Sequence, residues 1–401
     1  MKPYLPVLIL GLAGCSPVTE TSSPESASPA AIHQRLLTLD THLDTPIHFA
    51  RRGWSIAERH DYATDISQVD LPRMEVGGLD GGFFVIYTHQ GDLTPAGYAQ
   101  ARAAAERRQQ DILDMVAANR DAFELALTAD AAERIAASGK RFVFQSIENS
   151  WPLGEDIGAM QGFYDRGVRM AGPVHSRDNQ FADSATGDGR WGGLSPAGRQ
   201  WVAEMNRLGI VVDGSHSSDA AIDQLIALSA TPIILSHSGP RALNGHARNL
   251  DDDGIRSVAR SGGAICVNSV FLAPRESTPE RDALDERLEA INDMTPKEQR
   301  AITAELRDLD ARAPQEASTF EMFMASLLHL IDVAGVDHVC MGADWDGGGG
   351  VAGMRDISGL PRISERLLAA GYGEADLRKI WSGNVLRLLR RAEAHAASLR
   401  Q

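Results

Sequence analysis

The sequence predicts an α/β fold, a (β/α)8 barrel of the TIM type, and two observations support this prediction. Eight short apolar runs rich in β-branched residues recur between residues 36 and 347, and stretches with helical periodicity lie between them. The runs are continuous rather than alternating in polarity, as is typical of parallel strands covered on both faces. Repeated alternation of such strands with helices is the pattern of this barrel.

The candidate strands are, in chain order, 36–44 (LLTLDTHLD), 81–89 (GGFFVIYTH), 141–149 (RFVFQSIEN), 167–176 (GVRMAGPVHS), 209–218 (GIVVDGSHSS), 231–239 (TPIILSHSG), 262–271 (GGAICVNSVF) and 337–347 (DHVCMGADWDG). Between them, 98–119, 196–208 and 219–229 have helical periodicity and are rich in Ala, Glu, Arg and Leu. A longer excursion, about 274–317, lies between strands seven and eight and is dense in Arg, Glu and Asp. We expect a helical insertion there, either simply solvated or acting as a lid or subunit contact.

The N-terminal residues are typical of an exported lipoprotein. Lys2 precedes an apolar run, Leu5 to Leu12, that is too short to span a bilayer. The segment ending at Cys15 reads L-A-G-C and resembles the lipobox of bacterial lipoproteins, in which the cysteine is acylated; Ser16 favours the outer membrane by analogy. We expect a protein of the bacterial cell envelope that faces the periplasm and touches the membrane only through this lipid anchor. The alternative is a soluble periplasmic protein with an unmodified Cys15.

Composition indicates where the folded chain begins. We expect a signal peptide over residues 1–14, a flexible tether rich in Ser, Thr, Pro, Glu and Ala over 15–31, and a single barrel domain over 32–401. Cys266 and Cys340 each lie inside an apolar run, and we expect small buried side chains rather than a disulfide framework.

The overall composition excludes several classes of protein. The chain has 401 residues, 43% hydrophobic and 23% charged, a soluble globular balance that excludes disorder and a multi-span membrane protein. Its net charge of -15 repels a phosphate backbone, so we expect no nucleic-acid partner.

Polar residues that can bind metal follow six of the eight candidate strands. His42 and Asp44 end the first strand, whose period of two places them on the same side. The others are, in chain order, Glu148, His175, His216, His237, Asp344 and Asp346. Because the carboxyl ends of barrel strands meet at one mouth, we expect these side chains to converge there.

Such a cluster requires positive charge at its centre. Imidazoles and carboxylates gathered in one pocket would repel one another or lack partners unless cations lay among them. Imidazole and carboxylate without thiolate suit two Zn²⁺ ions, with Mn²⁺, Fe²⁺ or Co²⁺ as competitors. Two metals ~3.5–4 Å apart need a bridging ligand, which in some barrel hydrolases is a carboxylated lysine. None of the four lysines follows a strand, so Glu148 is the expected bridge.

Other polar residues have simpler interpretations. We expect Asp346 to orient a loop, and Asp40 and Asp213 either to hold the ring of a neighbouring histidine or to bind loop amides. Arg248 could form a surface ion pair with Asp251 or Asp252. The glycines 347–350 lack a following GK[ST], so flexible backbone is favoured over a phosphate-binding loop.

Several longer segments surround these residues. They are DTHLDTP, QVDLPRMEVGGLDGGFF, SIEN, LSPAGRQWVAEMNRLGIVVDGSHSSD, SHSGPRAL, HARNLDDD, GADWDG and SGNVLRLL. Over about residues 36 to 389 the chain resembles the membrane dipeptidase (renal dipeptidase) family of binuclear zinc peptidases, as a bacterial lipoprotein member.

The resemblance implies a role for each residue at the mouth. The implied zinc ligands are His42 and Asp44 for one ion, His216 and His237 for the other, and Glu148 shared by both. His175 would polarise the substrate, Asp344 would be the catalytic aspartate, and Arg248 would bind the substrate carboxylate.

With these roles, the resemblance implies a zinc-dependent dipeptidase that hydrolyses the amide bond of small peptides by a hydroxide bridging the metals. It makes tolerance of a C-terminal D-residue an expectation and leaves a homodimer open. The sequence departs from the family at Asn149 and Ser150, where many members have Gly-Gly, and at 269–273, which lacks the tyrosine of characterised members. Both departures lie near the expected rim and leave the substrate range open.

Two alternatives remain at this point. The first is another binuclear metal-dependent barrel enzyme, an amidohydrolase or lactonase; many of those begin with H-x-H and use a lysine bridge, which this chain lacks. The second is a non-catalytic lipoprotein that binds peptide or stores metal. Asp344 and His175 argue against it, because a binding protein needs neither.

Overall fold

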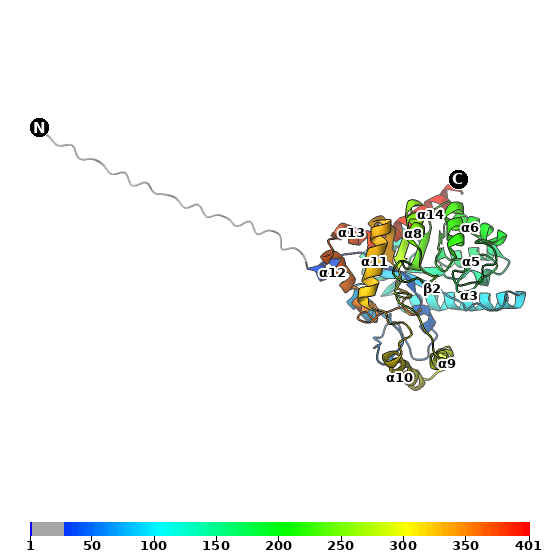
Figure 1. Cartoon of the computed structure of the whole chain (residues 1–401), viewed down its shortest axis with the longest axis horizontal. Coiled ribbons are helices and arrows are strands. Elements are labelled where there is room, and N and C mark those ends of the chain that lie inside the picture. The colour runs from blue at the N-terminus through cyan, green and yellow to red at the C-terminus, as the bar shows by residue number, and fades with distance from the viewer. Residues whose placement is uncertain (2–27) are drawn as a thin grey trace.

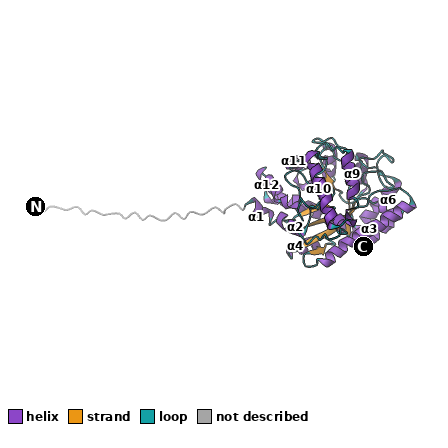
Figure 2. Cartoon of the chain, turned by 90° about the horizontal axis from the view of Figure 1, so that it is seen from below, coloured by secondary structure: helices purple, strands orange, loops and turns teal. Residues whose placement is uncertain are grey.

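The computed structural model describes residue 1 and residues 28–401, which form a barrel-like core of strands surrounded by helices (Figures 1 and 2). The strands are β1 (Leu39–Leu43), β2 (Gly81–Ile86), β3 (Phe123–Leu125), β4 (Arg141–Ile147), β5 (Val168–Ala171), β6 (Val211–Val212), β7 (Ile234–Ser238), β8 (Ala264–Val267) and β9 (Val339–Met341). The helices are α1 (Pro29–His33), α2 (Leu71–Gly77), α3 (Pro95–Ala118), α4 (Ala129–Ala137), α5 (Met160–Asp165), α6 (Pro196–Leu208), α7 (Asp219–Leu228), α8 (Asp252–Arg260), α9 (Pro279–Leu288), α10 (Pro296–Arg312), α11 (Phe320–Ala334), α12 (Pro361–Ala369), α13 (Glu374–Arg378) and α14 (Asn384–Ser398).

The strands pair in parallel in two sheets. The larger sheet has the order β1-β2-β4-β5-β6 with β3 beside β4, and the smaller has the order β7-β8-β9. Isolated parallel bridges connect the sheets on both sides, from Asp213 to Ile234 and from Leu43 to Trp345. The architecture is therefore an α/β fold whose parallel sheet forms at least a half-barrel, consistent with the predicted TIM-like fold.

Neighbouring residues of one strand point into two different apolar clusters. In β2, Phe83 packs inside the strands against Phe144 of β4, with ring centres 4.9 Å apart. Phe84, the next residue, belongs to a different cluster, which includes Ile112 and Met115 of α3. Because successive side chains of a strand alternate between faces, these strands are buried on both faces, as their continuous apolar runs predict.

Residues at the helix ends determine where the helices begin and end. The side chain of Ser195 accepts a hydrogen bond from the amide of Gly198, and Gly209, with a φ of 83°, ends the same helix. Serine caps and left-handed glycines are the usual boundaries. The bounds of α6 therefore match the predicted 196–208, whereas α3 begins earlier than predicted, at Pro95 after the Thr94 cap.

The segment between β8 and β9 forms α9 and α10 before α11 returns to the barrel. Figure 1 draws α9 and α10 together at one edge of the molecule, on the side away from α14. They share a small apolar cluster that includes Leu284 and Ile302. An ion pair from Arg281 to Asp310, 2.7 Å long, also joins them.

Several elements were not predicted, among them β3 and α1. The strand β3 has only three residues, too few for an apolar run to stand out. The helix α1 begins at Pro29, inside the predicted tether, and His33 attaches it through hydrogen bonds of 2.7 Å to Ser364 Oγ and 2.9 Å to the carbonyl of Gly77.

The predicted signal peptide, Cys15 and most of the tether lie outside the described residues. No helix within 28–401 has the length and hydropathy needed to cross a membrane.

The expectation for Cys266 and Cys340 was wrong, because the structure joins them in a disulfide. The two residues lie 74 positions apart in sequence but face each other directly across β8 and β9. Both are fully buried in the cluster inside the strands. The apolar runs around each cysteine carry no information on strand register, and register alone brings the two sulfurs together.

This disulfide should stabilise the fold. Closing a loop of this length restricts the unfolded chain and contributes ~2–4 kcal/mol. We expect the double variant Cys266→Ala, Cys340→Ala to unfold at a lower urea concentration than the wild type, and reductant present during unfolding to lower the wild-type midpoint to that of the variant. Cys15→Ala is the matched control and should unfold as the wild type does. If reductant does not change the urea midpoint of the wild type, the disulfide between Cys266 and Cys340 is contradicted.

Candidate metal centre and active site

The five predicted metal ligands lie at the carboxyl ends of four strands and are buried together. They are His42 in β1 and Asp44 just after it, Glu148 after β4, His216 after β6, and His237 in β7. Each is exposed by 7% or less. Residues spread over almost two hundred positions of the chain are thus brought to one mouth, as the barrel prediction requires.

The carboxylate of Glu148 is the centre of this cluster. Its Oε1 lies 2.9 Å from Nε2 of His216, 3.5 Å from Nε2 of His237 and 3.6 Å from Nε2 of His42. The two imidazoles of His216 and His237 face each other, with 2.8 Å between their Nε2 atoms. One carboxylate oxygen within reach of three imidazole nitrogens fits a centre that binds metal.

The donor atoms fit divalent metal ions. Neighbouring donors of a tetrahedral site with bonds of ~2.0–2.1 Å lie ~3.3 Å apart, and Nε2 of His42 is 3.3 Å from Oδ2 of Asp44. This buried Nε2 makes no hydrogen bond, although it also lies 3.6 Å from Glu148 and 4.0 Å from Asp344. Three sets of residues each bring ligand atoms within 4.8 Å of one another. They are His42, Glu148 and His237; Glu148, His175 and His216; and His42, Asp44 and Asp344.

The protonation states support the same interpretation. Burial, with a further effect from Arg248, lowers the pKa of His216 well below its usual value, and burial lowers that of His237 likewise. Both imidazoles are therefore neutral, the form that binds metals. Burial would also lower the pKa of His42, but the carboxylates of Glu148 and Asp44 raise it to about 10. Burial raises the pKa of Glu148 well above its usual value. A cation among these groups would stabilise the deprotonated carboxylate.

Two buried carboxylates lie behind the ligands. Asp213 accepts a hydrogen bond from Ser236 Oγ, which in turn lies 2.9 Å from Nδ1 of His237, so this carboxylate holds the ring through the serine. Asp40 instead accepts from the amides of His42 and Ala343, at 2.9 and 3.1 Å. Asp213 also accepts from the amides of Ser215 and Ser236, at 2.9 and 3.0 Å, so it has both predicted roles, whereas Asp40 has only the second.

His175 lies beside the ligands but is more open to the pocket. Its Nε2 is 3.5 Å from Oε1 of Glu148, and its ring centre is 4.0 Å from that of His216. Its side chain is 22% exposed, whereas those of His42, His216 and His237 are exposed by 9% or less. This imidazole can therefore face a bound molecule.

Asp344 and Arg248 also face the cluster. Burial raises the pKa of Asp344 to about 6. Arg248 is 4% exposed, and its Nη2 donates to the carbonyl of His237 at 3.1 Å. Among the described residues it has no ion pair, and Asp251 instead caps α8, so the alternative of a surface ion pair does not hold. This bond to His237 places its guanidinium beside the cluster.

Asp346 orients loops, as predicted. Its carboxylate accepts from the Thr45 hydroxyl at 2.7 Å and from the Gln68 amide at 2.6 Å, and lies 3.2 Å from Nε2 of His48. These bonds connect the segment after β9 to the segments after β1.

The cluster opens into a cavity of about 340 Å³. Among the described residues, only four that are not glycine have a positive φ, and all four line this cavity: His216, Phe271, Asp344 and Asp346. This backbone conformation is unfavourable for residues with a Cβ and is concentrated at functional sites.

Sequence reasoning missed two prominent residues of this cavity, Tyr87 and Arg275, whereas Phe271 lies in the segment 269–273 that it placed near the rim. Tyr87, Phe271 and Arg275 all line it, and the Tyr87 ring centre is 4.8 Å from that of His175. Tyr87 lies two positions before the end of a predicted strand, a position comparable to those of the histidines, and could have been predicted. Arg275 lies in the charged segment 274–317, where nothing in the sequence distinguishes it. The departures at Asn149 and Ser150 do not line the cavity; they are fully buried and bind neighbouring loops, through Trp151 and Gly172.

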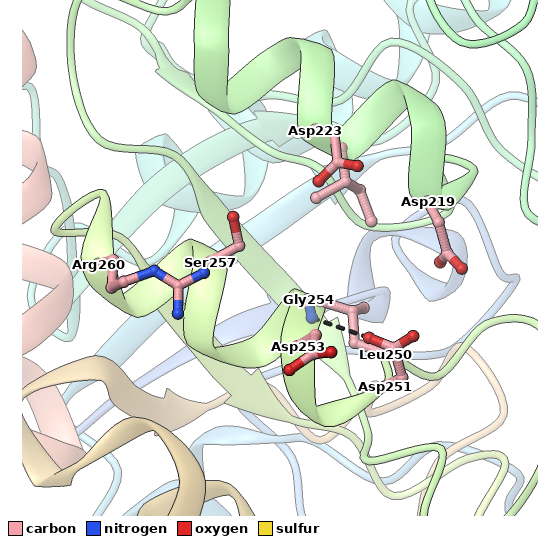
Figure 3. A pocket seen from close by; sticks show the side chains of 9 residues that line it. Asp219, Asp223, Leu250, Asp251, Asp253, Gly254, Ser257 and Arg260 are labelled. Atoms are coloured by element: carbon pink, nitrogen blue, oxygen red, sulfur yellow. Dashed lines mark hydrogen bonds between the residues drawn. The ribbon is translucent and has the colours of Figure 1, made fainter.

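A second hollow of about 320 Å³, which shares no lining residue with this cavity, lies between α7 and α8 (Figure 3). Asp219, Asp223, Asp251 and Asp253 line it together with Arg260. Figure 3 shows Asp251 turned to cap the amide of Gly254. The described residues around it include no histidine or cysteine, and the hollow lacks the donor set of a transition-metal site.

A family model described as membrane dipeptidase (peptidase family M19) matches residues 27–401. The chain belongs to the membrane dipeptidase family. The dipeptidase tcpJ of Claviceps purpurea (strain 20.1) is 29% identical over 353 residues, 86% of this chain and 74% of that protein. The probable dipeptidase PvdM from Pseudomonas aeruginosa is 29% identical with a TM-score of 0.78, covering 92% of this chain and 98% of that one.

A third relative is a metallo peptidase from Rhodobacter sphaeroides, solved with a phosphinate mimic of the dipeptide L-Ala-D-Ala. It is 28% identical with a TM-score of 0.70, covering 89% of this chain and 99% of that one. The predicted family is therefore confirmed. As a member of the membrane dipeptidase family, the protein is a dipeptidase of a metal-dependent peptidase family, and its clustered ligands fit that dependence.

Replacing the central carboxylate should remove metal from this membrane dipeptidase. Glu148→Gln keeps the size of the side chain but loses the charge that balances a bound cation, so we expect metal to be lost on dialysis. Elemental analysis of the purified variant measures this. Glu365→Gln, at an exposed helix position, is the control and should retain metal as the wild type does. Full metal content in Glu148→Gln would remove Glu148 from the metal centre.

Proposed function

We propose that the protein is a zinc-dependent dipeptidase that hydrolyses the amide bond of dipeptides with a free C-terminal carboxylate, including dipeptides with a C-terminal D-residue. The observation that carries this proposal is the Glu148 oxygen among three buried imidazoles, with Asp344 beside His42 and Arg248 bonded to His237. The solved relative that holds a mimic of L-Ala-D-Ala supports the D-residue.

Two zinc ions are the proposed cofactors. His42 and Asp44 would hold one ion, His216 and His237 the other, and Glu148 both. Nitrogen and oxygen donors without thiolate also suit Mn²⁺, Fe²⁺ or Co²⁺. When bound, such ions supply a water that loses its proton near neutral pH and polarise the scissile carbonyl.

His175 is proposed to stabilise the carbonyl oxygen as it becomes negative. Burial and the charge of Arg248 lower the pKa of His175 to about 3, so the ring is neutral and has one N–H. When the Ser176 hydroxyl, 2.8 Å away, donates to Nδ1, the hydrogen is on Nε2, which faces the cavity. A donor aimed at developing charge contributes most in the transition state.

Asp344 is proposed to carry the proton from the attacking water to the departing amine. Its position beside His42, in the wall of the cavity, places the carboxyl next to the reacting atoms. The raised pKa of about 6, caused by burial, lets the carboxyl hold and release a proton near neutral pH.

Arg248 is proposed to bind the C-terminal carboxylate of the substrate. Burial lowers the pKa of its guanidinium to about 10, which still leaves it charged at neutral pH. A guanidinium binds a carboxylate with two parallel hydrogen bonds. Because this contact requires a chain end close to the scissile bond, it selects dipeptides over longer peptides.

The proposed location is the periplasmic side of the bacterial cell envelope, with a lipid anchor on Cys15, in the outer membrane. The disulfide between Cys266 and Cys340 supports an oxidising compartment, because such bonds are rare in reducing cytosol. The L-A-G-C segment supports the anchor.

A panel of dipeptides tests the proposed function. Purified protein loaded with zinc is assayed on L,L- and L,D-dipeptides, an N-acyl amino acid amide without a free carboxylate, and a lactone, before and after chelation. We expect hydrolysis of free dipeptides only, its loss on chelation, and its recovery when zinc is added back. Lactone hydrolysis without dipeptide hydrolysis would favour the alternative barrel enzyme. Tight peptide binding without any turnover would favour the binding protein.

Loss of the proposed proton carrier should separate metal binding from turnover. Asp344→Asn keeps the shape of the side chain but cannot accept a proton, and general acid–base groups contribute ~10²–10⁴-fold to rate. We expect kcat for a dipeptide to fall by about that factor while zinc content stays near that of the wild type. A variant with near-normal kcat would exclude Asp344 from proton transfer.

A further inference from the structure

Arg275 lines the catalytic cavity, and the proposed mechanism gives it no role. It follows β8 in the segment that leads to α9. It lines both the cavity at the metal centre and a neighbouring cavity of about 640 Å³, which α9 and α10 help to form. Ile47 and Asp346 also line both cavities, so the two adjoin at these residues. A substrate group that leaves the catalytic cavity on this side would pass Arg275.

The segment before Arg275 is held in place by hydrogen bonds at several points. The carboxylate of Glu316 accepts from three successive amides, those of Phe271 (3.0 Å), Leu272 (2.7 Å) and Ala273 (3.2 Å). The carbonyl of Phe271 accepts from the side chains of Asn244 (2.8 Å) and Asn249 (3.0 Å). These bonds stabilise the positive φ of Phe271, 60°, which the residue would not otherwise favour. The backbone that precedes Arg275 is therefore held in one conformation by these hydrogen bonds.

The charge of Arg275 is only partly balanced. Among the described residues its guanidinium makes one hydrogen bond, from Nη2 to Oε1 of Gln315 at 2.6 Å. The nearest carboxylate, Glu316, is 3.8 Å away and is occupied by the three amides. The side chain of Arg275 is 33% exposed, and a guanidinium has five N–H donors. Most of its donors are therefore available to a ligand.

Arg275 and Arg248 lie around the same aromatic ring. Their guanidinium carbons are 6.0 Å and 5.9 Å from the centre of the Phe271 ring, so they lie within about 12 Å of each other. The two carboxylate carbons of an extended glutamate residue are ~5 Å apart. Each would lie ~4 Å from the carbon of a guanidinium that binds it. A residue with two carboxylates can thus reach both arginines at once.

We propose that Arg275 is a specificity-determining residue, which binds the side-chain carboxylate of an acidic C-terminal residue while Arg248 binds its terminal carboxylate. The preferred substrates are then dipeptides that end in glutamate or aspartate. This inference rests on the proposed function, because it assumes that Arg248 binds the chain end. The adjoining cavity accommodates the longer side chain of glutamate.

A comparison of charged and neutral side chains of equal size tests the proposal. Zinc-loaded wild type and Arg275→Gln are assayed on Ala-Glu and Ala-Gln, and on Ala-Asp and Ala-Asn, each with L- and D-residues at the C-terminus. We expect the wild type to favour the acidic member of each pair by about 10-fold in kcat/KM, since hydrogen bonds between charged groups are stronger than neutral ones. In Arg275→Gln this preference should vanish through a higher KM for the acidic dipeptides, with kcat retained and the neutral dipeptides unchanged.

A second arginine supplies the matched control. Arg355 is exposed and lines the neighbouring cavity but not the catalytic one. Arg355→Gln removes the same charge and should leave the preference as it is in the wild type. Arg275→Lys keeps the charge without the planar fork and should retain part of the preference.

The outcomes distinguish this inference from the proposed function. Hydrolysis of all dipeptides without an acidic preference, or an equal loss on acidic and neutral dipeptides in Arg275→Gln, would overturn the role of Arg275 and leave the dipeptidase in place. If Arg355→Gln loses the acidic preference as much as Arg275→Gln does, the preference comes from the general charge of the cavity. That result would also overturn the inference. If zinc-loaded wild type hydrolyses no dipeptide, the proposed function fails and the inference fails with it.

Discussion

The site depends on one buried carboxylate that faces several imidazoles. Oε1 of Glu148 lies within 3.6 Å of Nε2 of His42, His175, His216 and His237, and all of these side chains except His175 are buried. Burying these groups together is unfavourable unless charge is balanced among them. Divalent cations meet that requirement. Burial of these side chains in one cluster therefore itself requires bound metal. The parallel strands matter because their carboxyl ends bring these side chains to one point.

The same mouth gathers groups whose environments move their pKa values in opposite directions. Burial lowers the pKa of His216 and His237, which favours neutral ligands, and raises that of Asp344 to about 6, which favours a proton carrier. Burial also lowers the pKa of Arg248, but only to about 10, so a cation stays beside them. The mouth therefore gathers neutral imidazoles, a carboxyl group with a pKa near neutral pH and a buried cation. Positive φ values at His216, Phe271 and Asp344 show that the backbone adopts unfavourable conformations to place them.

Much of this could be predicted from particular residues. The continuous apolar runs indicated parallel strands, and the polar residues just after them indicated the mouth, because strand ends converge in a barrel. Glu148 stood out because no lysine follows a strand. The short strand β3 and the helix α1 escaped prediction, since three to five residues carry too little periodicity. Arg275 escaped because it lies in the charged excursion, where one arginine looks like any other until the fold places it in the cavity wall.

The sequence by itself determined eight of the nine strands, the types of side chain at the strand ends and the family, since these depend on residues close together in the chain. Only the tertiary structure decided which distant residues touch. Strand register paired Cys266 with Cys340. Hydrogen bonds to Glu316 fixed the backbone before Arg275. Packing of the α9 and α10 segment against the barrel formed the adjoining cavity. Such contacts depend on register and packing across hundreds of positions, and no local pattern of residues encodes them.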